Sequence, residues 1–419
     1  MRVNVHDYSG HPFQVQLSRE LAARGHTVLH TYAEQYVTGH GQLTVTDADP
    51  ATLRIRPLRV DRALDKYSPV RRVAFEHEYA SVWKELLDAE PFDLVVACNI
   101  PLFALARMRR YFERRNQRWV LWHQDLYSLG VGAEAERRLP RPLAGVARRW
   151  FEHLEQAQVA SADGVVPITG AMVRQYEAWG LDPQHATVLP NWAPIEDITP
   201  VARDNSWARE QQLPERAVRL MYAGTLGRKH NPQLLLDILD GVKQRGVDAV
   251  LIVASEGQGA DDLAAAAQGR ADVRLVGYQP ADRFSEVLSS ADSVVALLEP
   301  DASRFSVPSK VLSYLSAGRP IIALLPADNP AAHDVTAARG FVGAPNQAGA
   351  LAAAEWLVST CQDSAALAAI GWQARLLAEK RFDIERIADE FEQVFVRAAG
   401  TPTDAYAERG GSSTVQVDA

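Results

Sequence analysis

Short apolar runs alternate with helix-like segments along most of this chain. The apolar segments predict strands at residues 3–5, 26–32, 92–99, 118–125, 163–169 and 186–190. Between the first two, residues 13–25 carry apolar side chains at helical spacing and end at a glycine. This rhythm is typical of a parallel sheet covered by helices on both faces.

The alternation of strands and helices is interrupted at residues 191–216, which are rich in proline and charged residues, and it resumes after them. The second series predicts strands at residues 219–225, 248–255, 273–278, 292–299 and 319–326, and beyond about 345 the pattern is helical. We therefore expect an α/β fold with two doubly wound Rossmann-like domains, whose strand ends face a central cleft. The expected limits are 1–198, 199–380, a closing helix at 381–398 and a disordered tail at 399–419.

The bulk composition narrows the classes of function. At 419 residues the chain exceeds what one hydrophobic core usually supports. Its net charge of -8 argues against general binding of nucleic acid, because such binding needs a basic surface. The 2 cysteines suggest no disulfide framework and fit a reducing cytoplasm. We expect no signal peptide, because the apolar start turns polar at His6, and no membrane-spanning segment.

An anion site is predicted directly after the strand at 292–299. Pro308, Ser309 and Lys310 are expected to open a helix there, and Gly318 is expected to end it. The free N–H groups of a first helical turn favour a negative ligand, and Lys310 adds a full charge beside them. A helix start at the carboxyl end of a parallel strand is where a nucleotide diphosphate binds. A solvated surface lysine is the alternative.

The loop at 223–232 has a second phosphate-binding pattern. Gly224 and Gly227 permit close approach of the backbone, while Arg228 and Lys229 supply positive charge before a predicted helix. The spacing is not that of a Walker A loop, and a basic surface turn is the alternative. Because this loop and the Lys310 segment both follow strands of the second half, we expect them to hold one diphosphate together.

Two loops of the first half carry further candidates. Gly10 and His11 follow the first strand, but the dinucleotide fingerprint GxGxxG is missing, which argues against a hydride-transfer enzyme. His123 and Asp125 end the strand at 118–125, where they could hold a sugar hydroxyl, stabilise positive charge or exchange protons. The alternatives are that His11 is only a turn residue, and that Asp125 caps a turn above a packed His123.

With both halves in view, the chain resembles the GT-B glycosyltransferases, and within them the retaining family 4 enzymes of the bacterial envelope polysaccharide type. The resemblance covers about residues 1–398 and rests on GHPFQVQLSRELAARGH (10–26), WHQDLYS (122–128), VLPNWAP (188–194), YAGTLGRKHNP (222–232) and VPSKVLSYLSAGRPII (307–322). It implies a GT-B fold in which the N-terminal domain binds the acceptor and the C-terminal domain binds the nucleotide sugar.

The resemblance also implies roles for single residues. His123 matches the family histidine that contacts the transferred sugar, and the expected catalytic set is His123, Asp125 and Lys310. The expected donor-binding set is Gly10, His11, Gly224, Thr225, Gly227, Arg228, Lys229, Glu299, Ser309 and Lys310. Cations and helix N–H groups stabilise a departing diphosphate, so no metal cofactor is expected.

The chain departs from the family pattern at one place. Many members carry two glutamates, eight positions apart, that contact the sugar and the ribose. Counting back from Gly318 places Phe305 and Ser313 at those positions. The resemblance therefore implies that the sugar contact comes from elsewhere, with Glu299 or Asp301 as candidates, and it leaves the donor open.

We therefore expect a retaining glycosyltransferase that moves a sugar from a UDP- or GDP-sugar to a saccharide or lipid-linked acceptor in envelope polysaccharide or glycoconjugate synthesis. The alternatives are a non-catalytic GT-B protein that binds nucleotide sugars, and a nucleotide-sugar epimerase. Residues 107–119 and 137–154 are basic and aromatic, so we expect contact with an anionic membrane, at the inner face of the cytoplasmic membrane. Solvated helix faces are the alternative there.

Overall fold

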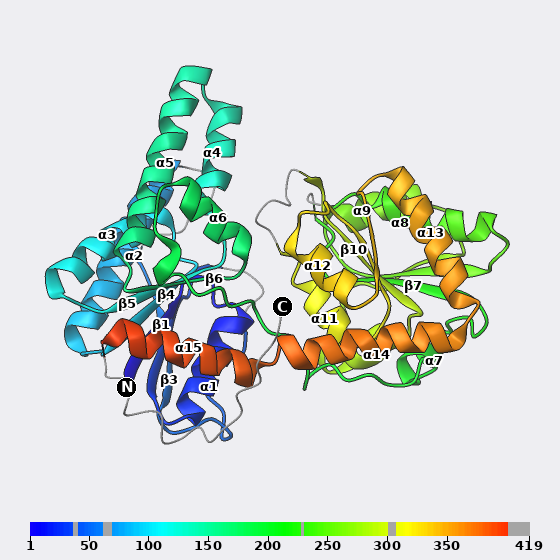
Figure 1. The fold of residues 1–419 in the computed structure, drawn as a ribbon, viewed down its shortest axis with the longest axis horizontal. Coiled ribbons are helices and arrows are strands. Elements are labelled where there is room, and N and C mark those ends of the chain that lie inside the picture. Colours follow the sequence, from blue (N-terminus) through cyan, green and yellow to red (C-terminus); the bar gives the residue numbers. More distant parts are fainter. Residues whose placement is uncertain (37–40, 62–68, 228–229, 301–306, 401–419) are drawn as a thin grey trace. The chain divides into compact units, whose positions relative to one another are not determined.

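The computed structural model describes the chain except for residues 37–40, 62–68, 228–229, 301–306 and 401–419. The chain forms two compact units (Figure 1). The N-terminal unit contains Met1–Pro190 and the segment from Glu385 onward, and the C-terminal unit contains Asn191–Ile384. The predicted domain limits stay a prediction, and the expected tail from residue 401 onward lies outside the described residues.

The N-terminal unit is built on a six-stranded sheet in the order β3-β2-β1-β4-β5-β6, in which all neighbours run parallel. Its strands are β1 (Arg2–Asp7), β2 (Thr27–Ala33), β3 (Leu53–Leu58), β4 (Leu94–Cys98), β5 (Trp119–His123) and β6 (Gly164–Pro167). Its helices are α1 (Pro12–Ala23), α2 (Pro69–Ala89), α3 (Leu102–Arg115), α4 (Tyr127–Arg138), α5 (Arg141–Ser161), α6 (Gly170–Ala178), η1 (Pro183–His185) and α15 (Ile384–Ala399). Central strands such as β4 are buried along their whole length, as expected when helices cover both faces.

The C-terminal unit repeats this plan, with a parallel sheet in the order β12-β11-β10-β7-β8-β9. Its strands are β7 (Val218–Ala223), β8 (Ala249–Ala254), β9 (Val273–Leu275), β10 (Ser293–Leu297), β11 (Ile321–Leu324) and β12 (Phe341–Gly343). Its helices are α7 (Ser206–Glu210), α8 (Gln233–Gln244), α9 (Gln258–Ala266), η2 (Ala281–Arg283), α10 (Phe284–Ser289), α11 (Lys310–Ser316), α12 (Pro330–Ala337), α13 (Gln347–Cys361) and α14 (Ser364–Arg381). The predicted class of two Rossmann-like units is thus confirmed.

Three local predictions differ from the structure. Residues 186–190 form no strand, and only an isolated bridge joins Ala186 to Val165. The edge strands β3 and β12 were not predicted, because β3 is interrupted by arginines and a proline and β12 is only three residues long. Pro308 does not occupy the first helical position, since α11 begins at Lys310 and is seven residues long.

The strand order places one topological switch point in each unit. In the N-terminal unit the chain leaves β1 toward β2 and later returns to β4 on the other side of β1. In the C-terminal unit β7 is flanked by β8 and β10 in the same way. Ligands of open α/β sheets bind outside the carboxyl ends of the strands at such points. The loops after β1, β4, β7 and β10 are therefore the places to look for chemistry.

The C-terminal helix α15 packs on the N-terminal unit, and one aromatic contact shows how (Figure 1). Phe391 is fully buried, and its ring centroid lies 4.8 Å from that of Trp122 on β5. Arg24 at the end of α1 adds an ion pair at 2.9 Å to Glu392. The helix therefore completes the core of the unit that contains the first residues of the chain.

Replacing Phe391 by alanine should lower the free energy of unfolding of the N-terminal unit by about 3–5 kcal/mol, because a buried aromatic ring leaves a cavity. Urea unfolding followed by tryptophan fluorescence measures this change. Gln393→Ala, at an exposed position of the same helix, is the matched control and should change little. Equal stability of the two variants would contradict the packing of α15 against β5.

Candidate active site

Helix α11 is held over the switch point of the C-terminal unit by one buried tyrosine. The Tyr314 hydroxyl accepts a hydrogen bond from Ala223 N–H at 3.0 Å. It also lies 3.0 Å from Ala223 O and 3.2 Å from Val295 O, to either of which it can donate. Gly318, at φ 60°, ends the helix as predicted. Helix α11 is thereby fixed against the end of β7 and the middle of β10.

Lys310, the first residue of α11, reaches back over the end of β7. Its Nζ lies 3.7 Å from the centroid of the Tyr222 ring and donates to the Tyr222 hydroxyl. The carbonyl oxygen of Thr225 lies 3.4 Å from the same Nζ. These partners are neutral, and burial of the ammonium lowers the pKa of Lys310 to about 7. A lysine at a switch point that forms no ion pair with a carboxylate among the described residues is well suited to an anionic ligand.

Because the pKa of Lys310 is lowered, we expect the affinity for a nucleoside diphosphate to depend on pH. A bound diphosphate favours the charged ammonium and raises the pKa of Lys310, so the complex holds more protons than the free protein. The affinity for UDP or GDP should be highest below pH 7, and it should fall by roughly tenfold for each pH unit above 7. Calorimetric titration from pH 6.5 to 9 measures it. Lys310→Arg, which stays charged, should lose this dependence, and an equally flat profile in the wild type would contradict the assignment.

The glycine-rich loop after β7 lies beside this lysine. Gly224 has φ 99°, which favours glycine, and a Cβ there would lie 3.9 Å from Lys310 Nζ. Gly227 N–H donates to His230 Nδ1 at 3.0 Å, which closes the loop. The structure thus brings the predicted residues Gly224, Thr225 and Lys310 together. Arg228 and Lys229 lie outside the described residues, so their predicted role is untested.

The edge of this site continues toward β8 and β9. The Tyr278 side chain is half exposed, and its hydroxyl lies 2.9 Å from Thr225 Oγ1. Tyr278 N–H donates to Glu256 Oε1 at 3.3 Å. The aromatic ring of Tyr278 and the carboxylate of Glu256 therefore lie beside the Lys310 site, at the carboxyl ends of the strands. Neither side chain was predicted to have a role.

For the remaining predicted residues of the C-terminal unit that lie in the described part of the chain, the structure gives a position in the fold but no side-chain hydrogen bond with Lys310. Ser309 is exposed immediately before α11, and its side chain makes no capping hydrogen bond to the helix. Glu299 is half-buried two residues after the end of β10. Phe305 and Asp301 lie outside the described residues, and Ser313 lies within α11.

At the switch point of the N-terminal unit, Asp7 organises the loop that carries Gly10. Asn99 Nδ2 and Ser9 N–H donate to Asp7 Oδ1 at 2.8 and 3.2 Å. His11 N–H donates to Asp7 Oδ2 at 2.6 Å. Burial raises the pKa of Asp7 to about 6, although these donors act in the opposite direction. Gly10, at φ 67°, and His11 therefore belong to a loop fixed by a carboxylate that was not among the predicted site residues.

His123 lies at the end of β5 inside a buried network. Its Nδ1 lies 2.6 Å from the Tyr176 hydroxyl, and its Nε2 lies 3.3 Å from Glu155 Oε1. Glu155 also accepts hydrogen bonds from the N–H groups of Tyr127 at 2.8 Å and Ser128 at 3.1 Å. Both ring nitrogens thus face protein groups, while Asp125 is exposed two residues further on. The contact of His123 with a sugar stays a prediction.

Solved structures share this fold over nearly the whole chain. A sucrose-phosphate synthase from Thermosynechococcus elongatus has a TM-score of 0.72 at 14% identity, with 96% of this chain and 100% of that chain covered. Anabaena HepE, solved with UDP and glucose, has a TM-score of 0.64 at 15% identity over 94% and 98% of the two chains. WaaG, a glycosyltransferase involved in lipopolysaccharide biosynthesis, has a TM-score of 0.65 at 16% identity over 94% and 99%. At these identities the likeness shows the fold, which is GT-B.

Two family descriptions match the sequence in chain order. Residues 11–192 match the glycosyl transferase 4-like domain, and residues 217–358 match the glycosyl transferases group 1. The chain belongs to the GT-B glycosyltransferases. No curated protein sequence matches it closely enough to count as a relative. The Lys310 site thus lies in the group 1 domain of this glycosyltransferase, and the Asp7 loop begins just before its 4-like domain.

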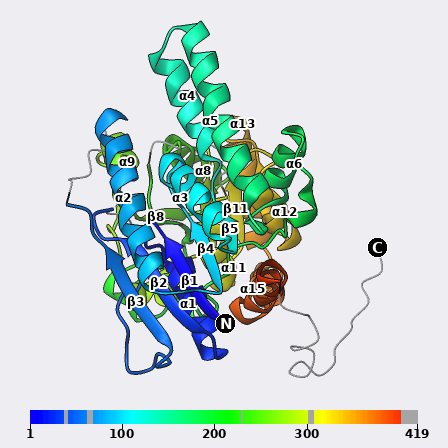
Figure 2. The same cartoon turned by 90° about the vertical axis from the view of Figure 1, so that its left-hand side faces the viewer.

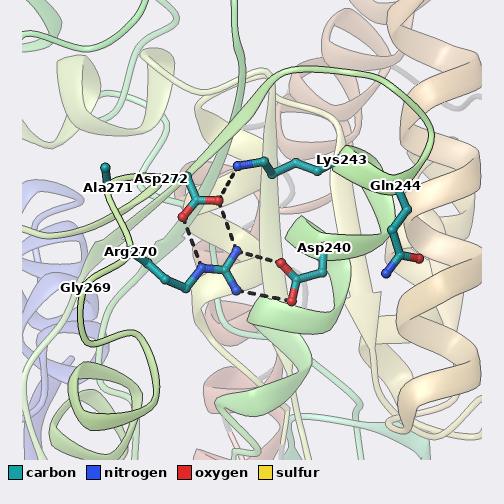
Figure 3. Close-up of a pocket in the computed structure, with 7 residues that line it drawn as sticks. All are labelled: Asp240, Lys243, Gln244, Gly269, Arg270, Ala271 and Asp272. Atoms are coloured by element: carbon teal, nitrogen blue, oxygen red, sulfur yellow. Dashed lines mark hydrogen bonds and ion pairs between the residues drawn. The ribbon is translucent and has the colours of Figure 1, made fainter.

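A surface hollow of this glycosyltransferase lies elsewhere in the C-terminal unit. It measures about 690 Å³ and is lined by the end of α8 and the loop before β9, at the amino ends of the strands (Figure 3). Arg270 bonds both Asp240 and Asp272, and Lys243 bonds Asp272 (Figure 3). The hydrogen bonds from Arg270 lower the pKa of Asp272. Because these charges neutralise one another, the hollow offers no charge for a diphosphate.

Across the part of the chain that the structure describes, no three His, Cys, Asp or Glu side chains gather to hold a metal ion. The expectation that donor binding needs no metal stays a prediction.

Proposed function

We propose that this protein is a retaining family 4 glycosyltransferase that uses a nucleoside diphosphate sugar. The observation that carries the proposal is Lys310, a desolvated cation held at the switch point of the group 1 domain beside a glycine loop. Sugar transfer leaves a nucleoside diphosphate that gathers negative charge in the transition state. A cation already fixed there, in a site of low polarity, stabilises that charge without further reorganisation.

The neighbouring side chains fit the nucleoside half of such a donor. With the diphosphate at Lys310, the exposed face of Tyr278 is available to stack on a base. Glu256, hydrogen-bonded to the backbone of Tyr278, can accept hydrogen bonds from ribose hydroxyls. Ser313 stands where many family members carry the glutamate that contacts the ribose, and Glu256 is proposed to replace that glutamate. Glu299 is the candidate for the sugar contact. UDP is the first donor nucleotide to test, because Anabaena HepE was solved with UDP and glucose.

The N-terminal unit is proposed to bind the acceptor and the reacting end of the donor. Gly10 and His11 belong to the loop fixed by Asp7, and Asp125 is exposed beyond the network of His123 and Glu155. Such fixed loops allow polar groups to be placed against a sugar with little reorganisation. A saccharide or lipid-linked acceptor in envelope polysaccharide synthesis is proposed, since WaaG is involved in lipopolysaccharide biosynthesis.

A thermal-shift panel of UDP-, GDP-, ADP- and dTDP-sugars tests the donor class. A ligand that binds only the folded protein raises its melting temperature according to affinity and concentration. We expect one nucleotide to stabilise the wild type and to stabilise Lys310→Ala much less. If no nucleotide sugar shifts the wild type at millimolar concentration, the proposal is contradicted.

Product analysis separates the two other functions. A non-catalytic binding protein would show the thermal shift but no acceptor-dependent release of nucleoside diphosphate. An epimerase would change the donor without any acceptor. We expect nucleoside diphosphate and a new glycoside in equal amounts, with the anomeric configuration of the donor retained.

The place of action is proposed to be the inner face of the cytoplasmic membrane, where lipid-linked acceptors are found. No helix in the described part of the chain is long and apolar enough to cross a membrane.

A further inference from the structure

Helix α5 exposes a stripe of large apolar side chains. Leu143, Val146 and Trp150 are 58%, 68% and 49% exposed, and their spacing places them on one face of the helix. Leu139, in the turn between α4 and α5, is also exposed. The α4–α5 hairpin projects from the sheet of the N-terminal unit, so this face is not covered by that sheet (Figures 1 and 2). We call Leu143, Val146 and Trp150 the α5 stripe.

The α5 stripe continues into a row of arginines on α3. The ring centroid of Trp150 lies 5.4 Å from that of Phe103, in the first turn of α3. Arg107, Arg110 and Arg114 follow Phe103 at helical spacing and are exposed. Within the described residues none of these three forms an ion pair with a carboxylate. We call Arg107, Arg110 and Arg114 the α3 arginines.

Some other basic residues of the same region are neutralised, whereas Arg141 and Arg149 on α5 are exposed and have no carboxylate partner among the described residues. Arg109 pairs with Glu113 at 2.5 Å, and Arg148 pairs with Glu152 at 2.8 Å. From the sequence, residues 107–119 and 137–154 were expected to form one basic, aromatic region. The structure sorts that region into paired charges, an apolar stripe and a row of arginines without carboxylate partners among the described residues. The last two adjoin at Phe103.

We propose that the α5 stripe and the α3 arginines form a surface that docks on an anionic lipid bilayer. Apolar side chains on an exposed helix face enter the boundary between headgroups and acyl chains, while adjacent arginines attract anionic headgroups. A local positive row on a chain of net charge -8 matches the sign of such a surface. The inference extends the proposed function, because a lipid-linked acceptor lies in a bilayer.

Co-sedimentation with vesicles tests the surface without any donor or acceptor. The wild type should bind vesicles that contain phosphatidylglycerol more strongly than pure phosphatidylcholine vesicles, and salt should weaken that binding. Each arginine near an anionic surface contributes roughly fivefold in partitioning, so Arg107→Gln/Arg110→Gln/Arg114→Gln should bind about a hundredfold more weakly. The charge-matched control Arg209→Gln/Arg216→Gln/Lys380→Gln, at exposed positions of the C-terminal unit, should bind as the wild type.

The apolar part is tested by Leu143→Ser/Val146→Ser, with Trp372→Ser as the control. Trp372 is 64% exposed on α14, so its loss removes a similar apolar surface elsewhere. We expect only the α5 variant to lose vesicle binding. Both α5 side chains are exposed, so the variant should keep its melting temperature.

Two results would overturn the inference. One is equal sedimentation of the wild type with neutral and anionic vesicles. The other is a wild-type dimer that the α5 variant makes monomeric in light scattering, with vesicle binding unchanged, since the stripe would then bind a second copy. Either result leaves the nucleotide thermal shift intact, whereas failure of the proposed function would abolish that shift and leave vesicle binding.

Discussion

Sugar transfer by Lys310→Ala should be slower than by the wild type by a factor on the order of 10² or more. The variant loses the cation that we propose to stabilise the departing diphosphate, and the group is already fixed against Tyr222 and Thr225 before the reaction. Initial rates of nucleoside diphosphate release at saturating donor measure the loss. Lys380→Ala, at an exposed position of the same unit, is the matched control and should keep its rate.

The melting temperature of Lys310→Ala distinguishes a role of Lys310 in catalysis from a role in maintaining the fold. Because burial lowers the pKa of Lys310 in the folded protein, its charged form disfavours folding at pH values below the unfolded pKa. Free Lys310→Ala should therefore melt no earlier than the wild type at pH 7. A variant with normal kinetics and a normal fold would contradict the assignment. A variant that is slow and also unfolded would contradict it as well, because the rate loss would then come from the fold and not from the missing charge.

His123→Ala should reduce turnover by roughly 10² while changing nucleotide affinity much less. His123 belongs to the N-terminal unit, and its partners Tyr176 and Glu155 are in that unit as well. Loss of the ring removes support from the loop that carries Asp125. Parallel measurement of kcat and of the nucleotide dissociation constant checks this, and a pure loss of nucleotide binding would contradict it.

Glu155→Gln tests the same hydrogen-bond network through the carboxylate that faces His123. A glutamine amide would meet the N–H donors of Tyr127 and Ser128 with one oxygen only, so the start of α4 should be less well fixed. We expect reduced turnover here too. Glu152→Gln, on the same helix at a partly exposed position, is the control and should retain activity.

The fold could be predicted where apolar runs are long and where glycine ends a helix. Strands β4 and β10 are buried at every position, so their sequences are apolar apart from Ser293 at the start of β10. Strand β3 was missed because an edge strand needs fewer apolar side chains, and LRIRPL alternates them with arginine. The packing of α15 on the first unit could not be predicted, since the pattern gives its apolar face but not the surface that receives it.

The site could be predicted where its residues lie in segments that follow the strands of the sheet. Gly224 was found because it directly follows β7, and Lys310 because it begins the helix after β10, and parallel strands bring such segments together. Glu155 could not be found, because it is 32 residues from His123 and lies on a long helix with another glutamate, Glu152. Asp7 could have been found, because it is a charged residue at the carboxyl end of the first strand. Tyr278 needed the structure to place it beside Thr225.

The most direct test is a calorimetric titration at pH 6.5 with the nucleoside diphosphate whose sugar conjugate gives the largest thermal shift. We predict one site per chain in the wild type and, in Lys310→Ala, an affinity lower by at least about tenfold, because a charge-assisted contact is lost. Lys380→Ala should bind as the wild type does. Equal affinity of the wild type and Lys310→Ala would contradict the claim that this lysine holds the diphosphate.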